Sequence, residues 1–373
     1  MHLALFSSTV DVRNGYGNIT YELATHLHAK GVELTLFLPE SEGNIARSLG
    51  FQFDTRCVLP PYIFRCFQPA AISHLQCIDL RSFDLVHSLF AFPYCFIAAR
   101  SAKKSVIPFM MGAQGTYGVL PLTYFPEKYL LKWCYGRAQQ ICVPSEFTKQ
   151  MIQQYAHNEY PIRVIHNGVR YARFAAAPDI ADLKRQYAGK QILLTVGGLK
   201  ERKGQDLVIR ALAMVKEQCP HLFYILVGEG NWRSYLADLA QQLGVADRVV
   251  FVGAKTGDEL VRYYYLSDIY VHTSRVASLQ FEGFGIVYLE AGACGKPVIA
   301  TDAGGIRDAV LDRETGIVVP DGDTKGIARA LVELCHDENR CRRLGENGRE
   351  YARKHDWDLI AGQYLSLYRT VRA

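Results

Sequence analysis

The segment that most constrains the fold of this chain runs from Phe281 to Gly305 and reads FEGFGIVYLEAGACGKPVIATDAGG. Its pattern predicts a glycine-rich loop, an apolar helix, a stop at Gly295-Lys296-Pro297 and a short buried strand from Val298 to Thr301. A helix that leads through such a stop into a buried strand is typical of an α/β sheet.

The loop before this helix is a candidate anion site. The N–H groups of a helix N-terminus carry partial positive charge, and Gly283 and Gly285 let a diphosphate approach the backbone. Glu290 lies five residues after Gly285, about one and a half helical turns on, where a carboxylate would repel a phosphate but accept hydrogen bonds from a vicinal diol. A sugar nucleotide carries both groups.

Glu282 and Glu290, eight positions apart, resemble the paired glutamates of retaining glycosyltransferases of family 4, which have the GT-B fold. The wording EGFGIVYLEAGACGKPVIA is most similar to mannosyltransferase and hexosyltransferase members. The resemblance implies that Glu290 binds the ribose hydroxyls and that Glu282 contacts the transferred sugar. It also implies that the backbone of Gly283, Phe284, Gly285 and Ile286 binds diphosphate and sugar. The alternative is an ordinary strand, loop and helix with two surface glutamates.

The composition is that of a globular protein with about two domains. The chain has 373 residues, 49% hydrophobic and 21% charged, and a formal net charge of +5, which is too small to indicate nucleic acid as a partner. The ten cysteines form no C-x-x-C pair and predict free thiols in a reducing compartment. With no leader-like N-terminus and no membrane-spanning apolar run, we expect a cytoplasmic protein.

The first residues predict a βαβ opening, with strands over 2–7 and 33–38 around a helix over 19–30. The loop before this helix contains Gly15 and Gly17 but lacks the third glycine of a dinucleotide fingerprint, so a nicotinamide site is the weaker interpretation. In the resembled family the equivalent loop approaches the donor phosphates, which makes Gly17 the expected contact.

Three other segments of the first half have two interpretations each. Residues 60–77 predict either packed connecting structure or an acceptor-side or membrane-facing loop. His87, at the end of a buried strand, is either a structural residue or part of the acceptor cleft. A helix over 127–138 carries a basic and aromatic face that either docks on anionic lipid or is simply solvated; its cations are Lys128, Lys132 and Arg137.

Gln114 follows a predicted strand over 105–110 and stands where the family commonly has a histidine pointing into the cleft between the domains. Glutamine can orient a hydroxyl but cannot exchange a proton near neutral pH. Either the chemistry is unaltered, with Gln114 as a hydrogen-bonding residue of the catalytic site, or the enzyme is weakened.

A second candidate anion site follows the predicted strand over 192–196. There, Gly197-Gly198 and the cations Arg202 and Lys203 precede a helix, which predicts a diphosphate site. The resemblance assigns Lys203 and Arg202 to the donor diphosphate and Gly198 to the same loop, although many relatives have an arginine at Gly198. The alternative is a surface charge cluster at a turn.

Two later turns follow predicted strands over 223–227 and 249–252, and should open on the same edge of the sheet. By resemblance they frame the nucleobase, with Gly228, Gly230, Gly253 and Lys255 as donor-binding candidates. Further on, Arg275–Gln280 lengthens the loop before Glu282 relative to many relatives.

The predicted architecture is GT-B, with two Rossmann-like domains facing across a cleft. His166-Asn167-Gly168-Val169 resembles the turn that closes the family's first domain, with Arg170 in place of the usual aspartate, and residues 175–179 predict a linker. We expect an acceptor-side domain over 1–174, to which a C-terminal helix over about 356–373 returns, and a nucleotide-sugar-binding domain over 187–355.

The resemblance implies retaining transfer of a hexose from a UDP- or GDP-linked sugar to a hydroxyl of a lipid-linked, polysaccharide or other glycoconjugate acceptor, with Glu282, Lys203 and Gln114 in catalytic roles. Because cations already face the leaving group and no D-x-D pair adjoins the loop, we expect no cofactor and no obligatory metal. A lipid-linked acceptor would bring the protein to the anionic inner face of the plasma membrane. The alternatives are a sugar-nucleotide epimerase of the same fold and a non-catalytic, donor-binding partner subunit.

Overall fold

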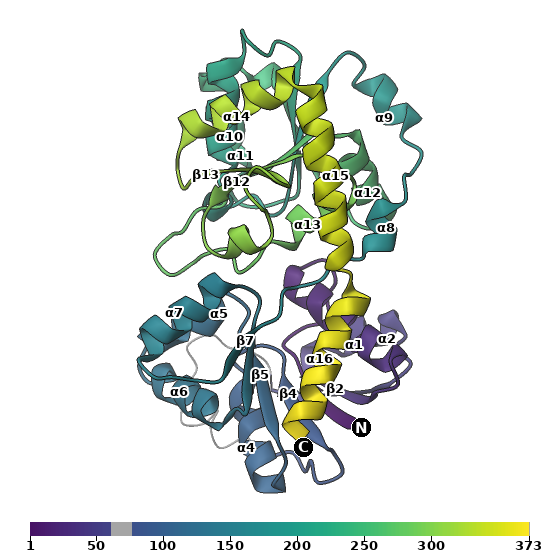
Figure 1. The fold of residues 1–373 in the computed structure, drawn as a ribbon, viewed down its shortest axis with the longest axis vertical. Helices are drawn as coiled ribbons and strands as arrows, with labels where there is room; N and C mark the ends of the chain where they lie inside the picture. The colour runs from purple at the N-terminus through teal and green to yellow at the C-terminus, as the bar shows by residue number, and fades with distance from the viewer. Residues whose placement is uncertain (61–76, 373) are drawn as a thin grey trace. The chain divides into compact units, whose positions relative to one another are not determined.

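Figure 1 shows the computed structural model, which describes residues 1–60 and 77–372. The chain divides into two compact units, one made of Met1–Asn167 with Trp357–Ala373 and the other of Gly168–Asp356. Residues 61–76, which form most of the segment with an acceptor-side loop as one prediction, lie outside the described residues.

The first unit is built on a parallel sheet, which within the described residues has seven strands in the order β3-β2-β1-β4-β5-β6-β7. The strands are β1 (His2–Phe6), β2 (Glu33–Pro39), β3 (Asp54–Leu59), β4 (Leu85–Ser88), β5 (Phe109–Gly112), β6 (Gln140–Val143) and β7 (Ile162–Val164). The helices are α1 (Gly15–Ala29), α2 (Gly43–Leu49), α4 (Cys95–Ser105), α5 (Thr116–Val119), α6 (Glu127–Arg137), α7 (Glu146–Ala156) and α16 (Trp357–Arg372).

Two boundaries in this unit differ from the sequence prediction. Helix α1 begins at Gly15 rather than near residue 19, because the side chain of Asn14 accepts a hydrogen bond from the Gly17 N–H at 2.8 Å and caps the helix. The strand predicted over 105–110 starts only at Phe109, because α4 continues to Ser105 and ends at Val106, whose φ of 60° is left-handed.

Helix α16 belongs to the first unit and packs on α1. Its buried face consists of Trp357, Ile360, Ala361, Tyr364, Leu367 and Tyr368. On β4, Nδ1 of the fully buried His87 lies 2.8 Å from the Tyr368 hydroxyl, and burial lowers the pKa of His87 to about 3. A neutral histidine that bonds α16 to the sheet favours the structural interpretation of His87.

The second unit is built on a parallel sheet of six strands in the order β10-β9-β8-β11-β12-β13. The strands are β8 (Gln191–Val196), β9 (Leu222–Val227), β10 (Val249–Gly253), β11 (Ile269–His272), β12 (Val298–Asp302) and β13 (Gly316–Pro320). The helices are α8 (Tyr171–Ala175), α9 (Ala181–Gln186), α10 (Gln205–Val215), α11 (Arg233–Gln242), α12 (Gly257–Leu266), α13 (Ile286–Ala293), α14 (Thr324–His336) and α15 (Glu338–Lys354).

This unit starts at Gly168, earlier than the domain boundary expected at residue 174. The reason is that α8 packs on α13: Phe174 shares a hydrophobic cluster with Leu289, and the thiol of Cys294 donates to the Phe174 carbonyl at 3.2 Å.

The second sheet is covered on both faces and has a switch point in its strand order. Leu193 of β8 belongs to one hydrophobic cluster, whereas its neighbours Ile192 and Leu194 belong to the other. The strand order reverses between the adjacent strands β8 and β11, and ligands of open α/β sheets bind outside the carboxyl ends of strands at such a point.

Among the described residues, no helix has the length and apolarity that a membrane crossing requires. Each cysteine in that part of the chain is a free thiol.

Candidate functional site

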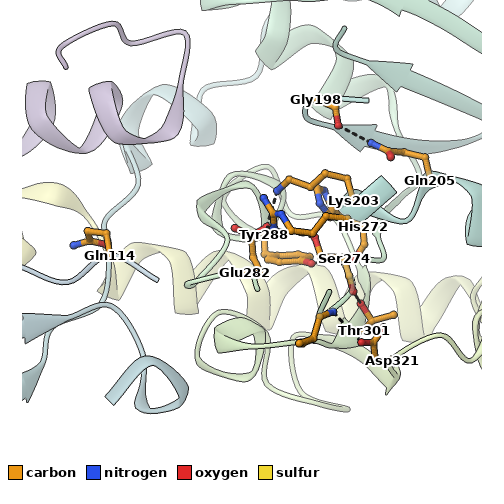
Figure 2. Close-up of polar contacts among 12 residues, drawn as sticks. Gln114, Gly198, Lys203, Gln205, His272, Ser274, Glu282, Tyr288, Thr301 and Asp321 are labelled. Carbon is orange, nitrogen blue, oxygen red and sulfur yellow. Dashed lines mark hydrogen bonds and ion pairs between the residues drawn. The ribbon is translucent and has the colours of Figure 1, made fainter. Parts of the chain in front are cut away.

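Three side chains of the second unit converge on one carboxylate oxygen at the switch point (Figure 2). Lys203 and Arg202 belong to the short 3-10 helix η3 (Glu201–Lys203) after β8, and Ser274 follows β11. On Oε2 of Glu282, Lys203 Nζ lies at 2.6 Å, Arg202 Nη1 at 3.2 Å and the Ser274 hydroxyl at 3.3 Å. The structure thus brings together Glu282 and the two cations that the sequence singled out.

The charges of this cluster are strongly coupled. The side chain of Glu282 is 17% exposed. Burial raises its pKa, but the charges of Lys203 and Arg202 outweigh this effect and hold the pKa at about 2. The carboxylate is therefore ionised, and two cations against one anion leave an excess positive charge for a ligand. Among the residues that the structure describes, no group of three or more His, Cys, Asp or Glu could hold a metal ion.

Two glycines allow the backbone to pack this closely. Gly204, with φ of 68°, follows η3, and a Cβ there would overlap the carbonyl oxygen of Thr273. Gly285, with φ of 92°, precedes α13, and a Cβ there would run into the ring of Tyr288. Helix α13 begins at Ile286, as predicted, so its first N–H groups have no acceptor within the helix.

Around this helix start, Gly283 is half-buried, and Phe284 points into the core with 1% exposure. Phe284 can therefore contribute only its backbone to a ligand. This agrees with the backbone role that the resemblance implies.

Glu290 is fixed by a partner that the sequence did not reveal. The hydroxyl of Tyr264, on α12, donates to Oε2 of Glu290 at 2.7 Å. Burial raises the pKa of Glu290 above its ordinary value. The hydrogen bond from Tyr264 and the nearby charges of Arg170 and Arg173 lower the pKa, but they offset only part of the effect of burial. Arg170, found where the family usually has aspartate, thus lies on the Glu290 side of the site.

The turns after β8, β9 and β10 are joined by hydrogen bonds. The Leu199 N–H donates to the Glu229 carbonyl, and the Gly228 N–H donates to the Gly253 carbonyl, each at 2.9 Å. These bonds place the predicted residues Gly198, Gly228, Gly230 and Gly253 at one edge. Lys255 is instead 2.5 Å from Glu259 in the first turn of α12, so a nucleobase would compete with this ion pair.

His272, at the end of β11, was missed by sequence reasoning. Its Nδ1 lies 3.2 Å from the Tyr270 hydroxyl, and its Nε2 has no hydrogen-bond partner within the described residues. Burial, assisted by the charge of Lys203, lowers its pKa to about 3, so the imidazole is neutral. The signal available in the sequence was a histidine at the end of a short apolar run, a few residues before the loop that leads to Glu282.

The remaining predicted residues lie in the first unit. Gln114 follows β5 and is 5% exposed; its Oε1 accepts from Asn167 Nδ2 at 3.2 Å, and its Nε2 has no partner in the described part of the chain. Gly17 lies in the first turn of α1, where its N–H is already bonded to Asn14. A phosphate contact at Gly17 would have to use a different group.

Comparisons with known proteins identify the family. The profile described as "Glycosyltransferase Family 4" matches residues 13–173, and that described as "Glycosyl transferases group 1" matches residues 179–351. A GDP-mannose-dependent alpha-(1-6)-phosphatidylinositol monomannoside mannosyltransferase of Mycolicibacterium smegmatis is 31% identical over 261 residues, which are 69% of this chain and 67% of the relative. The enzyme of the same name from Mycobacterium tuberculosis is 34% identical over 208 residues, and the match spans 54% of each chain.

Two solved structures have a fold similar to that of this chain over nearly its whole length. Anabaena Alr3699/HepE in complex with UDP has a TM-score of 0.80 at 20% identity, covering 99% of this chain and 100% of that one. Sucrose-phosphate synthase from Thermosynechococcus elongatus has a TM-score of 0.76 at 22% identity, covering 100% and 99%. At these identities the likeness shows the fold alone. The family profiles, the mycobacterial relative and the two parallel sheets confirm both predictions: the chain belongs to glycosyltransferase family 4 and has the GT-B fold.

Proposed function

We propose that the protein is a retaining hexosyltransferase that takes its sugar from a nucleoside diphosphate donor. The observation that carries this proposal is the cluster of Lys203, Arg202 and Glu282 at the start of α13, with Glu290 further along the same helix. The excess positive charge suits a diphosphate, and Glu290 suits the ribose diol.

The donor proposed first is GDP-mannose, because two mycobacterial relatives are named as GDP-mannose-dependent enzymes. A UDP-sugar is the second candidate, since Anabaena Alr3699/HepE was crystallised with UDP. In either case the diphosphate would draw Lys203 and Arg202 away from Glu282. The carboxylate would then be released to accept hydrogen bonds from the sugar hydroxyls.

Retention is proposed to proceed by attack from the same face as the departing diphosphate. Once the two cations have turned to the diphosphate, Glu282 is proposed to accept hydrogen bonds from the sugar hydroxyls rather than to attack the anomeric carbon. Lys203, Arg202 and the N-terminus of α13 would stabilise the negative charge that grows on the leaving group, and the diphosphate would accept the proton of the incoming hydroxyl. Gln114 is proposed to position sugar or acceptor hydroxyls through hydrogen bonds rather than to transfer a proton.

Metal independence is part of the same proposal, because the two cations neutralise the charge that Mg²⁺ would otherwise neutralise. Equal turnover in the presence of excess EDTA and of added Mg²⁺ is expected. Loss of turnover on chelation, restored by Mg²⁺, would contradict this.

The acceptor is proposed to be a hydroxyl of a lipid-linked glycan, as the names of the mycobacterial relatives suggest. A membrane-facing surface is proposed at α6, where Tyr129 is 59% exposed and the Lys128 ammonium lies 4.9 Å from the centre of its ring. Phe125, just before α6, is 79% exposed. Binding to anionic vesicles should exceed binding to neutral ones and weaken with salt, because exposed charges are screened over about 10 Å at 0.1 M. Equal partition onto both kinds of vesicle would rule out this surface.

The deciding experiment has two parts. Calorimetry with GDP, UDP and their mannose and glucose conjugates identifies the donor, and NMR of the product in the presence of glycolipid acceptors reports the anomeric configuration. An inverted product would contradict retention. Sugar isomerisation without acceptor would favour the epimerase alternative, and donor binding without turnover for any acceptor would favour a partner subunit.

A further inference from the structure

The loop between β11 and Glu282 contains an arginine that the proposed function does not use. The backbone N–H of Arg275 donates to the Arg202 carbonyl at 2.8 Å, and its Nη1 donates to the Glu201 carbonyl at 3.3 Å. One residue thus bonds to the backbone of η3 at two points. The residues of η3 include both cations of the candidate site.

The other end of the Arg275 guanidinium is anchored in the protein. Its Nη2 lies 2.6 Å from Oδ2 of Asp206, in the first turn of α10, and the side chain of Asp206 is only 7% exposed. A buried carboxylate needs a close counter-charge, so this pair resists separation. Arg275 therefore links the backbone of η3 to the start of the next helix.

The rest of this loop is also held in place. Ala277 and Gln280 exchange backbone hydrogen bonds of 2.9 Å each, and the Val276 N–H donates to the Asp321 carboxylate at 2.9 Å. Asp321 directly follows β13 and is labelled in Figure 2. The residues that lengthen the loop before Glu282 therefore form a fixed turn that supports Arg275.

We infer that Arg275 is a positioning residue, which holds η3 so that Lys203 and Arg202 face the donor diphosphate before it binds. This inference rests on the proposed function. A 3-10 helix of three residues has little stability of its own, and lysine has four rotatable side-chain bonds, so the geometry of the cations depends on what holds their backbone. A displacement of about 1 Å in such a group can cost about a hundredfold in rate.

The role of Arg275 in holding η3 can be tested without any sugar nucleotide. In Arg275→Ala, amide hydrogen exchange should accelerate at least tenfold at Lys203, Gly204 and Leu207, whose N–H groups are bonded within this segment. The matched control is Arg210→Ala, because Arg210 lies 4.0 Å from the same Asp206 and is 44% exposed. Exchange that is unchanged in Arg275→Ala, or accelerated equally in Arg210→Ala, would overturn the proposal.

A second variant removes the risk that an unpaired Asp206 unfolds the unit. In the double variant Arg275→Gln with Asp206→Asn the buried charge is gone, and the same local acceleration of exchange is expected at an unchanged melting temperature. A lowered melting temperature with exchange accelerated throughout the second unit would overturn the inference, because it would mean that Arg275 only stabilises the fold.

The positioning role is tested with a double-mutant cycle against Lys203→Ala, using the donor that calorimetry identifies. Arg275→Ala should lower kcat about tenfold to a hundredfold and change KM for the donor much less. In the Lys203→Ala background the same substitution should lower kcat by a clearly smaller factor, because only the positioning of Arg202 is then left to lose. Independent, multiplying effects would overturn the inference. Absence of wild-type turnover with every donor would instead count against the proposed function. The hydrogen-exchange results would still show whether Arg275 holds η3 in place.

Discussion

The two units share the arrangement of their central strands but differ in the side chains that follow those strands at the carboxyl edge of the sheet. The order β3-β2-β1-β4-β5 in the first unit corresponds to β10-β9-β8-β11-β12 in the second. In the second unit the loops at this edge carry two cations on a carboxylate, whereas in the first the buried amide of Gln114 bonds to that of Asn167. We call the cluster in the second unit the charged edge and the Gln114–Asn167 pair the neutral edge, and we propose that the charged edge serves a leaving diphosphate and the neutral edge orients hydroxyl groups.

Removing the ammonium from the charged edge should have the largest effect. Lys203→Ala should lower the turnover number about 10²- to 10³-fold, the range for loss of one group that stabilises transition-state charge, and weaken donor binding less. Steady-state kinetics and calorimetry measure the two effects. Lys200→Ala, at an exposed position of the same turn, serves as the control. A normal turnover number in Lys203→Ala would break the contrast between the two edges.

The ribose contact ranks second in expected effect. Glu290→Ala should weaken binding of the nucleoside diphosphate by about 1.5–3 kcal/mol, the range for hydrogen bonds to a charged group. Calorimetry at pH 7 measures this, with Glu346→Ala, at an exposed position on α15, as the control. Unchanged affinity in Glu290→Ala would show that Glu290 does not bind the ribose diol.

Tyr264→Phe tests the role of Glu290 at the charged edge through the pH dependence of nucleotide affinity. Burial raises the pKa of Glu290 and the Tyr264 hydroxyl lowers it, so loss of that hydroxyl should raise the pKa further. Since the diol is bound by the ionised form, nucleotide affinity should be complete above this pKa and be lost as the pH falls through it. The loss should therefore begin at a higher pH in Tyr264→Phe than in the wild type, as measured by titrations between pH 4.5 and pH 8.

The control for this titration is Tyr265→Phe, because the hydroxyl of Tyr265 donates to the Ala175 carbonyl at 2.8 Å instead. Coincident pH profiles for Tyr264→Phe and the wild type would show that Tyr264 does not tune Glu290.

The smallest effect is expected at the neutral edge. If Gln114 only donates and accepts hydrogen bonds, Gln114→His should change the rate less than tenfold, and the wild-type rate should be nearly flat between pH 6 and pH 8. Proton transfer by a side chain is worth about 10²- to 10⁴-fold. A gain above a hundredfold in Gln114→His, with a new pH dependence near the imidazole pKa, would show that the neutral edge lacks a needed acid or base.

The sequence predicted the elements that depend on local patterns. The glycine stop and apolar run around α13 and the cations before α10 are both encoded within a few residues. The resemblance to the family then assigned Glu282 and Lys203 to the same donor site. No local pattern could do this, because the two residues are separated by 79 positions.

What the sequence did not predict depends on contacts between distant segments. Tyr264 and Glu290 are 26 positions apart, and Arg275 and Asp206 are 69 apart, so neither pair leaves a periodic signal. The start of α1 was misplaced because Asn14 caps it across glycines that otherwise suggest a loop. The second unit begins at Gly168 rather than after the predicted linker over 175–179, because α8 packs on α13, and a contact between such distant segments leaves no local pattern.

The return of α16 to the first unit has a consequence for synthesis on the ribosome. The second unit is one continuous stretch, Gly168–Asp356, and can complete its core as soon as it has emerged. The first unit cannot, because α16 supplies the Tyr368 hydroxyl for the buried His87 and the apolar face that includes Trp357. Although its strands are made first, the N-terminal sheet must keep the surface that α16 covers open until the whole second unit and α16 itself have been translated.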